Sequence, residues 1–154
     1  MSSARGLANH SLYMARLVLA GWSRELGQAG ASRQAMQAAF APAVRLHLLD
    51  AYGWFLLATI RQNKLPDHAP HHSQELPPLG PGIAEPGELD EYRLLEREGW
   101  IGRLQATLPR GLPPKTRPGL LAISANYPQI EDYEEWAASF SALFARMADS
   151  LDEN

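Results

Sequence analysis

The sequence predicts an all-α protein, an antiparallel four-helix bundle with a long Pro-rich loop between its second and third helices. Apolar residues recur at three- and four-residue spacing over four long segments. No segment alternates with period two for long enough to predict a strand. The 154 residues suffice for one core, so we expect residues 1–154 to form a single helical domain. The absence of cysteine excludes disulfides and thiolate chemistry.

The first predicted helix, residues 4–28, carries two apolar stripes. One stripe consists of Leu7, Met14, Leu17 and Gly21, and the other of Leu12, Leu19, Trp22 and Leu26. Because two stripes wrap much of a helix, we expect this helix to be central in the fold. Ser2 or Ser3 can cap its start, and a positive-φ glycine, Gly27 or Gly30, can end it.

The second predicted helix begins after the N-cap candidate Ser32 and runs to about residue 63. Pro42 lies inside it, where it removes a backbone donor and clashes with the preceding turn, so we expect a kink or a break there. Tyr52, Trp54 and Phe55 point in different directions, and one of them is expected to reach a second surface. An exposed Trp54 would indicate a dimer interface.

Two further helices are predicted over residues 88–108 and 126–151. The apolar spacing of residues 130–151 is the clearest in the chain. In the helix predicted over residues 88–108, Gly99 is expected to divide the helix into two pieces. Prolines and glycines predict irregular connections over about residues 66–87 and 109–125. A loop as long as 66–87 is unusual in a compact domain and is a place for function.

The net charge of −3 is unevenly distributed. Residues 1–65 hold seven basic and two acidic residues, and the remainder holds seven basic and fifteen acidic residues, so the two parts carry +5 and −8. A basic part can bind an anionic polymer. No basic run exceeds one residue, which favours oppositely charged halves packing together and makes nucleic-acid binding an unfavoured reading.

Polar groups near the apolar faces of the first two helices form a candidate binding cluster: His10, Arg16, Arg45, His47 and Asp50. His47 and Asp50 are three residues apart and so are neighbours on one helix face. Asp50 lies in an apolar stretch and needs a partner, which the first helix can supply through His10 or Arg16. The cluster predicts either a small acid–base pocket or, as the favoured reading, a polar contact that fixes helix register.

The sequence predicts no metal site and no cofactor. His68, His71 and His72 cluster in the Pro-rich loop and can bind zinc or nickel weakly, but a loop does not hold four ligands rigidly. Glu-x-x-His, which di-metal carboxylate bundles require, does not occur. The phosphate-binding and hydrolase motifs built on glycine are also missing from the chain.

Helical nucleases of the HEPN type provide the enzyme alternative. They carry an arginine followed, after four to six residues, by a histidine, at a dimer interface. Arg5–His10 and Arg61–His68 have this spacing, but the composition yields about one such match by chance. No catalytic residue is assigned on this basis.

Three short motifs resemble an uncharacterised family of small helical proteobacterial proteins. They are Asn9-His10-Ser11-Leu12-Tyr13-Met14-Ala15 with Trp22, the stretch Tyr52-x-x-Phe55-Leu56, and Glu88 to Leu104 around Gly99-Trp100-Ile101. The resemblance covers residues 7–60 and 88–108. The family has no assigned activity, so the resemblance implies a helical bacterial protein and no catalytic residues.

The favoured function is a non-enzymatic interaction or accessory module that meets a protein partner or a second copy of itself. It would use a helical face or the Pro-rich loop. The alternatives are the HEPN-like ribonuclease and a binder of a small apolar ligand between the helices. The apolar stretch 51–60 is too short to cross a bilayer, and no secretory signal is clear, so a cytoplasmic location is the default expectation.

Overall fold

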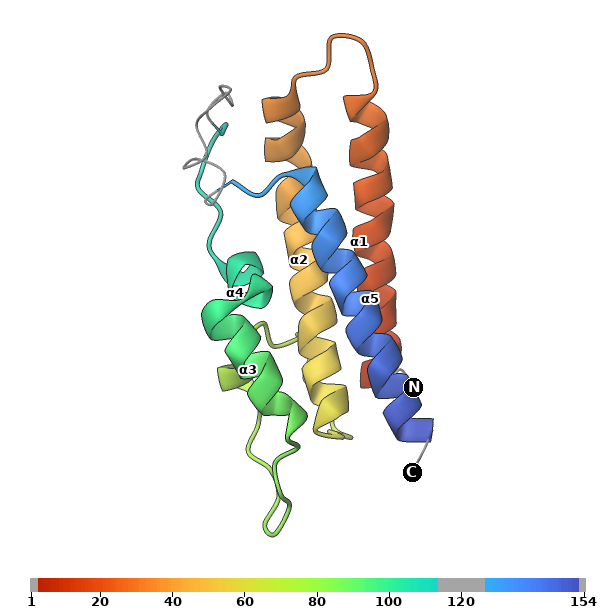
Figure 1. Ribbon diagram of the computed structural model, residues 1–154, viewed down its shortest axis with the longest axis vertical. Helices are drawn as coiled ribbons and strands as arrows, with labels where there is room; N and C mark the ends of the chain where they lie inside the picture. Colours follow the sequence, from red (N-terminus) through yellow and green to blue (C-terminus); the bar gives the residue numbers. More distant parts are fainter. Residues whose placement is uncertain (1–2, 114–126, 153–154) are drawn as a thin grey trace.

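The computed structural model describes residues 3–113 and 127–152, and every regular element in these ranges is a helix (Figure 1). The long helices are α1 (Ala4–Leu26), α2 (Arg33–Thr59) and α5 (Ile130–Asp152). The short ones are α3 (Glu88–Glu98), α4 (Trp100–Gln105) and the 3-10 turn η1 (Ser73–Glu75). The all-α prediction is confirmed for the described ranges. Most of the connection predicted over residues 109–125 lies outside them.

The first two helices form an antiparallel hairpin whose starts are capped by serines. The Ser3 hydroxyl accepts a hydrogen bond from the Gly6 amide at 3.0 Å, and the Ser32 hydroxyl accepts one from the Ala35 amide at 3.2 Å. Gly30, with φ of 78°, supplies the left-handed residue of the turn. Gly27 stays in the right-handed region at φ −76°, so the positive-φ role falls to Gly30.

α2 continues through Pro42, so a break at this position was the wrong expectation. The residues around the proline ring are alanines (Ala38, Ala39, Ala41 and Ala43), which leave room for it. Val44, just beyond, is fully buried against the core. Packing of the flanking turns therefore holds the helix together across one missing backbone hydrogen bond.

Gly99 interrupts the third predicted helix and separates α3 from α4. Its backbone is extended, and its amide donates to the Leu95 carbonyl at 3.0 Å. A Cβ at Gly102 would lie 2.1 Å from the Glu96 carbonyl oxygen. Only a residue without a side chain allows the first turn of α4 to fold back this closely on the end of α3.

The core lies between α1, α2 and α5 and is rich in aromatic rings. Trp22 stacks on Phe40 with ring centroids 6.1 Å apart and also contacts Tyr133 of α5. α3 and α4 join through Tyr92, 5.1 Å from Phe55, and Trp100, 4.6 Å from Phe140. These edge-on contacts attach the short helices to α2 and α5.

The aromatic residues of α2 do not reach a second surface, in contrast to the prediction. Tyr52 and Phe55 are fully buried, and Trp54 is buried as well. Because Trp54 is buried, it does not indicate a dimer interface.

α1 lies at the edge of the fold and not at its centre, contrary to the expectation from its two stripes. It packs against α2 and α5, with α5 covering the groove between the two hairpin helices (Figure 1). The stripe with Leu12, Leu19 and Trp22 is buried. Leu17, on the other stripe, is 48% exposed.

Residues 61–87 return along the lower half of α2 and touch it at Gly53. A Cβ built on Gly53 would lie 1.7 Å from the Pro70 carbonyl oxygen, closer than any two non-bonded atoms can approach. Gly53 is thus the point at which the segment docks on the helix.

Gly53→Ala is expected to lower the free energy of unfolding by about 2 kcal/mol, because the methyl group must displace the Pro70 backbone. Gly27→Ala is the matched control at the end of α1, since Gly27 has a right-handed backbone with φ of −76° and its added Cβ meets the Arg24 carbonyl oxygen at an ordinary 3.4 Å. The control is expected to stay within about 0.5 kcal/mol of the wild type. Urea unfolding measures both, and equal stabilities for the two variants would contradict the close docking.

Candidate functional site

The structure does not gather the predicted polar cluster into one pocket. His10 and Arg16 lie exposed on α1, and His47 is half-buried on α2. Each of these three side chains occupies a different part of the hairpin surface. Arg45 and Asp50 have specific partners elsewhere in the fold.

Arg45 binds the end of α4. Its Nε donates to the Leu104 carbonyl at 3.1 Å, and its Nη2 donates to the Gln105 carbonyl at 2.8 Å. Carbonyls at a helix C-terminus lack helical donors and carry partial negative charge, which a guanidinium satisfies. Arg45 therefore attaches α4 to α2.

Asp50 pairs with a histidine of the connecting segment and not with the first helix. Its Oδ1 lies 2.8 Å from His71 Nε2, and both side chains are about one-third exposed. The expectation that His10 or Arg16 would supply the partner is corrected, because residues 61–87 cover this part of α2. The favoured reading of Asp50 as a structural contact fits this arrangement.

Glu96 is the most buried carboxylate described, with a side chain only 2% exposed. It accepts hydrogen bonds from the Ser73 amide at 2.8 Å, from the Ser73 hydroxyl, and from Gln105 Nε2 at 2.9 Å. Gln105 Nε2 also donates to the His71 carbonyl at 2.8 Å. These donors satisfy a charge that would otherwise be costly to bury.

Tyr52 and His72 flank this carboxylate. Burial, together with the neighbouring Glu96 charge, raises the pKa of Tyr52. The Tyr52 hydroxyl nevertheless has no hydrogen-bond partner of standard geometry. His72 Nδ1 lies 3.5 Å from Glu96 and accepts from the Gln74 amide at 3.1 Å.

These groups do not form a nucleophilic triad. The Ser73 hydroxyl is buried and donates directly to the Glu96 carboxylate, so it is not presented to a substrate. The network instead fixes residues 71–75 against the junction of α3 and α4. Its chemical role is positioning.

The loop histidines do not converge as a metal site. His71 and His72 have the carboxylate contacts given above, whereas His68 is exposed. Among residues 3–113 and 127–152, no group of three or more histidine, aspartate or glutamate side chains is placed to hold a metal ion.

The two arginine–histidine pairs of nuclease spacing lie on different elements, although Arg5 and Arg61 line one shallow groove between the start of α1 and the end of α2. Arg5 and His10 are exposed on α1, and five residues correspond to a rotation of about 140° around a helix, so the two side chains diverge. Arg61 follows α2, and His68 lies on the segment beyond it.

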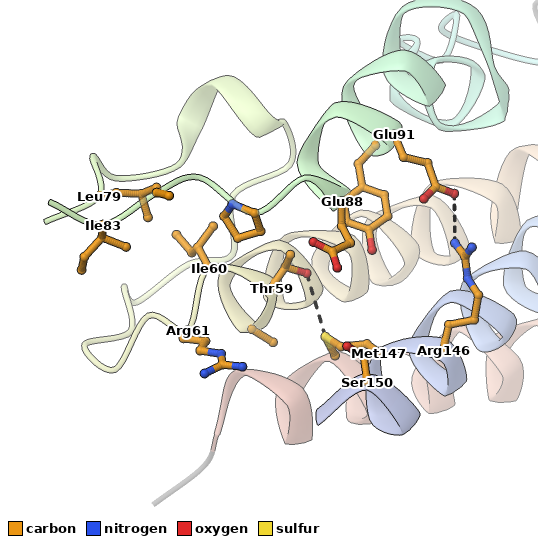
Figure 2. Close-up of a pocket in the computed structure, with 14 residues that line it drawn as sticks. Thr59, Ile60, Arg61, Leu79, Ile83, Glu88, Glu91, Arg146, Met147 and Ser150 are labelled. Atoms are coloured by element: carbon orange, nitrogen blue, oxygen red, sulfur yellow. Dashed lines mark hydrogen bonds and ion pairs between the residues drawn. The ribbon is translucent and has the colours of Figure 1, made fainter. Parts of the chain in front are cut away.

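A cleft of about 620 Å³ lies where α2 and α5 end, at the bottom of the view in Figure 1, and Figure 2 shows the residues that line it. Four elements line it: the end of α2, residues 79–86, the start of α3 and the end of α5. Ile60, Ile83 and Met147 give it an apolar surface, and Ile83 is 62% exposed. A volume of this size is typical of small-ligand sites.

Charged residues surround the cleft. Glu91 of α3 pairs with Arg146 of α5 at 2.9 Å (Figure 2), which raises the pKa of Arg146. Arg61 and Glu88 line the same cleft. Residues 79–86 form one wall of the cleft and are held to α3 by Arg93. Arg93 binds the carboxylate of Glu85 and lowers the pKa of that carboxyl group.

A second open surface lies on the side of the hairpin opposite α5. We define the outer hairpin face as Met14, Leu17, Val18 and Gly21 of α1 with Ala39, Ala43 and Leu46 of α2. All seven are exposed or half-buried, and Leu46 is 50% exposed. Both helices repeat the same spacing of four and three residues, which places these residues on one flank of each helix. None of the seven residues is charged, and Arg24 borders the face, with its Nη2 4.0 Å from the position of a Cβ added at Gly21.

Glu96 was not among the residues predicted from the sequence, and Arg61 was named only in an arginine–histidine pair of nuclease spacing. Glu96 follows Leu89 and Tyr92 at helical spacing, so its position on an apolar face was a readable signal. Its partner Ser73 is 23 residues away in an irregular segment, and no local pattern connects the two. Arg61 gave no signal, because its backbone conformation is set by the end of α2.

Glu96→Ala is expected to lower the free energy of unfolding by about 3 kcal/mol, because it leaves the buried Ser73 amide and hydroxyl without their acceptor and removes one of the two acceptors of Gln105. Glu98→Ala, on the exposed side of the same helix, is the control and should stay within about 0.5 kcal/mol. Chemical denaturation distinguishes the two. A loss for Glu96→Ala as small as the control's would mean that the network does not hold the segment.

The buried tyrosines predict alkaline instability. Burial raises the pKa of Tyr92 to about 12 and also raises those of Tyr52 and Tyr133. Above pH 10 the unfolded chain loses phenol protons that the folded chain retains, so stability falls as pH rises, by up to about 1.4 kcal/mol per pH unit for each group. Unfolding followed from pH 9 to 11 tests this, and Tyr92→Phe should reduce the slope. A flat profile would contradict it.

No family model, curated protein or solved structure matches the chain. No helix of the described ranges combines the length and apolar character needed to span a bilayer. Among the described residues, the chain's own candidate surfaces are the outer hairpin face and the cleft at the ends of α2 and α5.

Proposed function

We propose that this protein is a non-enzymatic interaction module that associates with a second copy of itself through the outer hairpin face. The observation that carries the proposal is the second apolar stripe of α1. A helix with apolar residues on two sides is typically buried on both. Among the described residues Leu7 of this stripe packs against the core, whereas Leu17 is 48% exposed and Met14 is only half-buried.

The size pattern along the face favours a second copy as the partner. The Trp22–Phe40 stack sets the level of the two antiparallel helices, which places Gly21 and Ala39 together at one end. The large residues Met14, Leu17 and Leu46 lie together toward the other end. A two-fold axis across the helices places the large end of one copy on the small end of its partner.

The lack of charge on this face also supports an apolar partner. None of the seven side chains carries a charge that a partner would have to neutralise, which suits the core of an interface. Below Leu46 the face ends at Asp50, which His71 already engages. The open area is thus limited to the upper part of the hairpin.

The fold that this proposal assumes is the antiparallel four-helix bundle, with α3 and α4 acting together as one interrupted fourth helix. Residues 66–87 then serve as the Pro-rich loop that covers the lower half of α2. Docking of two hairpins back to back would place α1 and α2 of both copies, four helices in all, at the centre of the assembly. Such packing by helix pairs matches the geometry of ordinary bundles.

Leu17→Glu is expected to convert a species of twice the 17.0 kDa chain mass into a monomer, because a carboxylate at the centre of an apolar interface is desolvated without a partner. Leu46→Glu should act alike. Leu94→Glu on α3 is the matched control, since Leu94 is exposed but lies away from the face, and it should remain dimeric.

Sedimentation at several protein concentrations gives the masses, and thermal unfolding checks that each variant is folded. A wild-type chain that remains monomeric at high concentration would refute self-association. Dissociation of the Leu94→Glu control would show that the interface lies elsewhere.

A further inference from the structure

The cleft at the ends of α2 and α5 contains an arginine at a backbone position that favours glycine. Arg61 has φ of 55°, and no other described residue except glycine has a positive φ. It follows the cap of α2 in a Schellman arrangement, with Arg61 N donating to the Ala58 carbonyl and Gln62 N to the Leu57 carbonyl. Glycine adopts this conformation without the steric cost that an arginine bears. The side chain therefore opposes local stability.

Arg61 has no ion pair with any residue of the described ranges, and it lines the cleft. The other arginine that lines the cleft, Arg146, forms an ion pair with Glu91. Of the two arginines, Arg61 is thus the one available to an anionic group of a ligand.

Glu88 supplies the opposite charge. It lies in the first turn of α3, lines the same cleft, and has no ion pair within residues 3–113 and 127–152. In Figure 2 Glu88 and Arg61 approach the cleft from two different elements, with Thr59 and Ile60 drawn near them. The cleft thus offers one available cation, one available anion and an apolar surface.

We propose that the cleft binds a small zwitterion whose anionic and cationic groups flank an apolar body, of the class of a short apolar peptide with free termini. The carboxylate would bind Arg61, the ammonium group would bind Glu88, and apolar side chains would contact Ile60, Ile83 and Met147. Charge-assisted hydrogen bonds at both ends orient such a ligand. This site is separate from the outer hairpin face and does not depend on self-association.

Trileucine with free termini is the probe, and its N-acetylated, C-amidated and doubly blocked forms are the matched ligands. Binding is followed by calorimetry and by chemical-shift changes of the Ile60 and Ile83 methyl groups. The free peptide is expected to bind, and blocking either terminus should weaken binding about tenfold.

Variants assign each charge to its partner. Arg61→Gln should weaken binding of the free peptide about tenfold but leave the C-amidated form unchanged, and Glu88→Gln should do the same with respect to the N-acetylated form. Arg103→Gln, on the exposed side of α4, is the control and should bind like the wild type.

Arg61→Gly separates the ligand role from a structural one. It should raise the melting temperature or leave it unchanged, since glycine suits the left-handed position, while weakening binding as Arg61→Gln does. The Leu17→Glu variant should bind trileucine normally. No binding of the free peptide in the millimolar range, or equal binding of the free and doubly blocked forms, would overturn the proposal.

Discussion

A carboxylate removed from water requires hydrogen-bond donors, and Glu96 receives them from Ser73 and Gln105. Ser73 belongs to the irregular segment, Glu96 to α3 and Gln105 to α4, so one buried charge joins three elements. Gly53 allows the irregular segment to pack on α2, because the Pro70 backbone can contact the helix where no side chain intervenes. The position of residues 61–87 follows from these contacts, and the extent of both open surfaces follows from that position.

The segment divides the surface of α2 into a covered and an uncovered part. Where the segment runs, its His71 pairs with Asp50 and its Pro70 covers Gly53. Nearer the start of α2, Ala39 and Leu46 are exposed among residues 3–113 and 127–152. Beyond the end of α2, the same segment becomes the wall of the cleft, with Leu79 and Ile83 facing the helical bundle. The ion pair between Arg93 and Glu85 holds that wall to α3. One irregular segment thus limits the outer hairpin face and builds the cleft.

The helical content was predictable because it depends on local spacing, whereas the functional geometry depends on long-range contacts. The serine caps at Ser3 and Ser32 and the interruption at Gly99 were readable from neighbouring residues. The pairing of Asp50 with His71 was not, because nothing local states which segment will cover a helix. Of the kink or break expected at Pro42, the break does not occur, because the local cost of the proline is offset by packing of the core around Val44. The exposure of Leu17 could not be predicted, because helical spacing shows which faces of a helix are apolar but not which elements cover them.

Natural sequences generally satisfy local preference and tertiary packing together, and they depart from this at functional positions. Two departures occur in this chain. Leu17, on the second stripe of α1, is 48% exposed among the described residues, and Arg61 holds a left-handed backbone that glycine would hold at lower energy. Neither helps the isolated chain to fold: the exposed part of Leu17 gains nothing from burial, and Arg61, which has no ion pair with a described residue, gains nothing from charge. Both acquire a physical reason once a second molecule is present, which is an apolar surface for Leu17 and an anionic group for Arg61. Because the two lie on different surfaces, each occupant can be removed without disturbing the other.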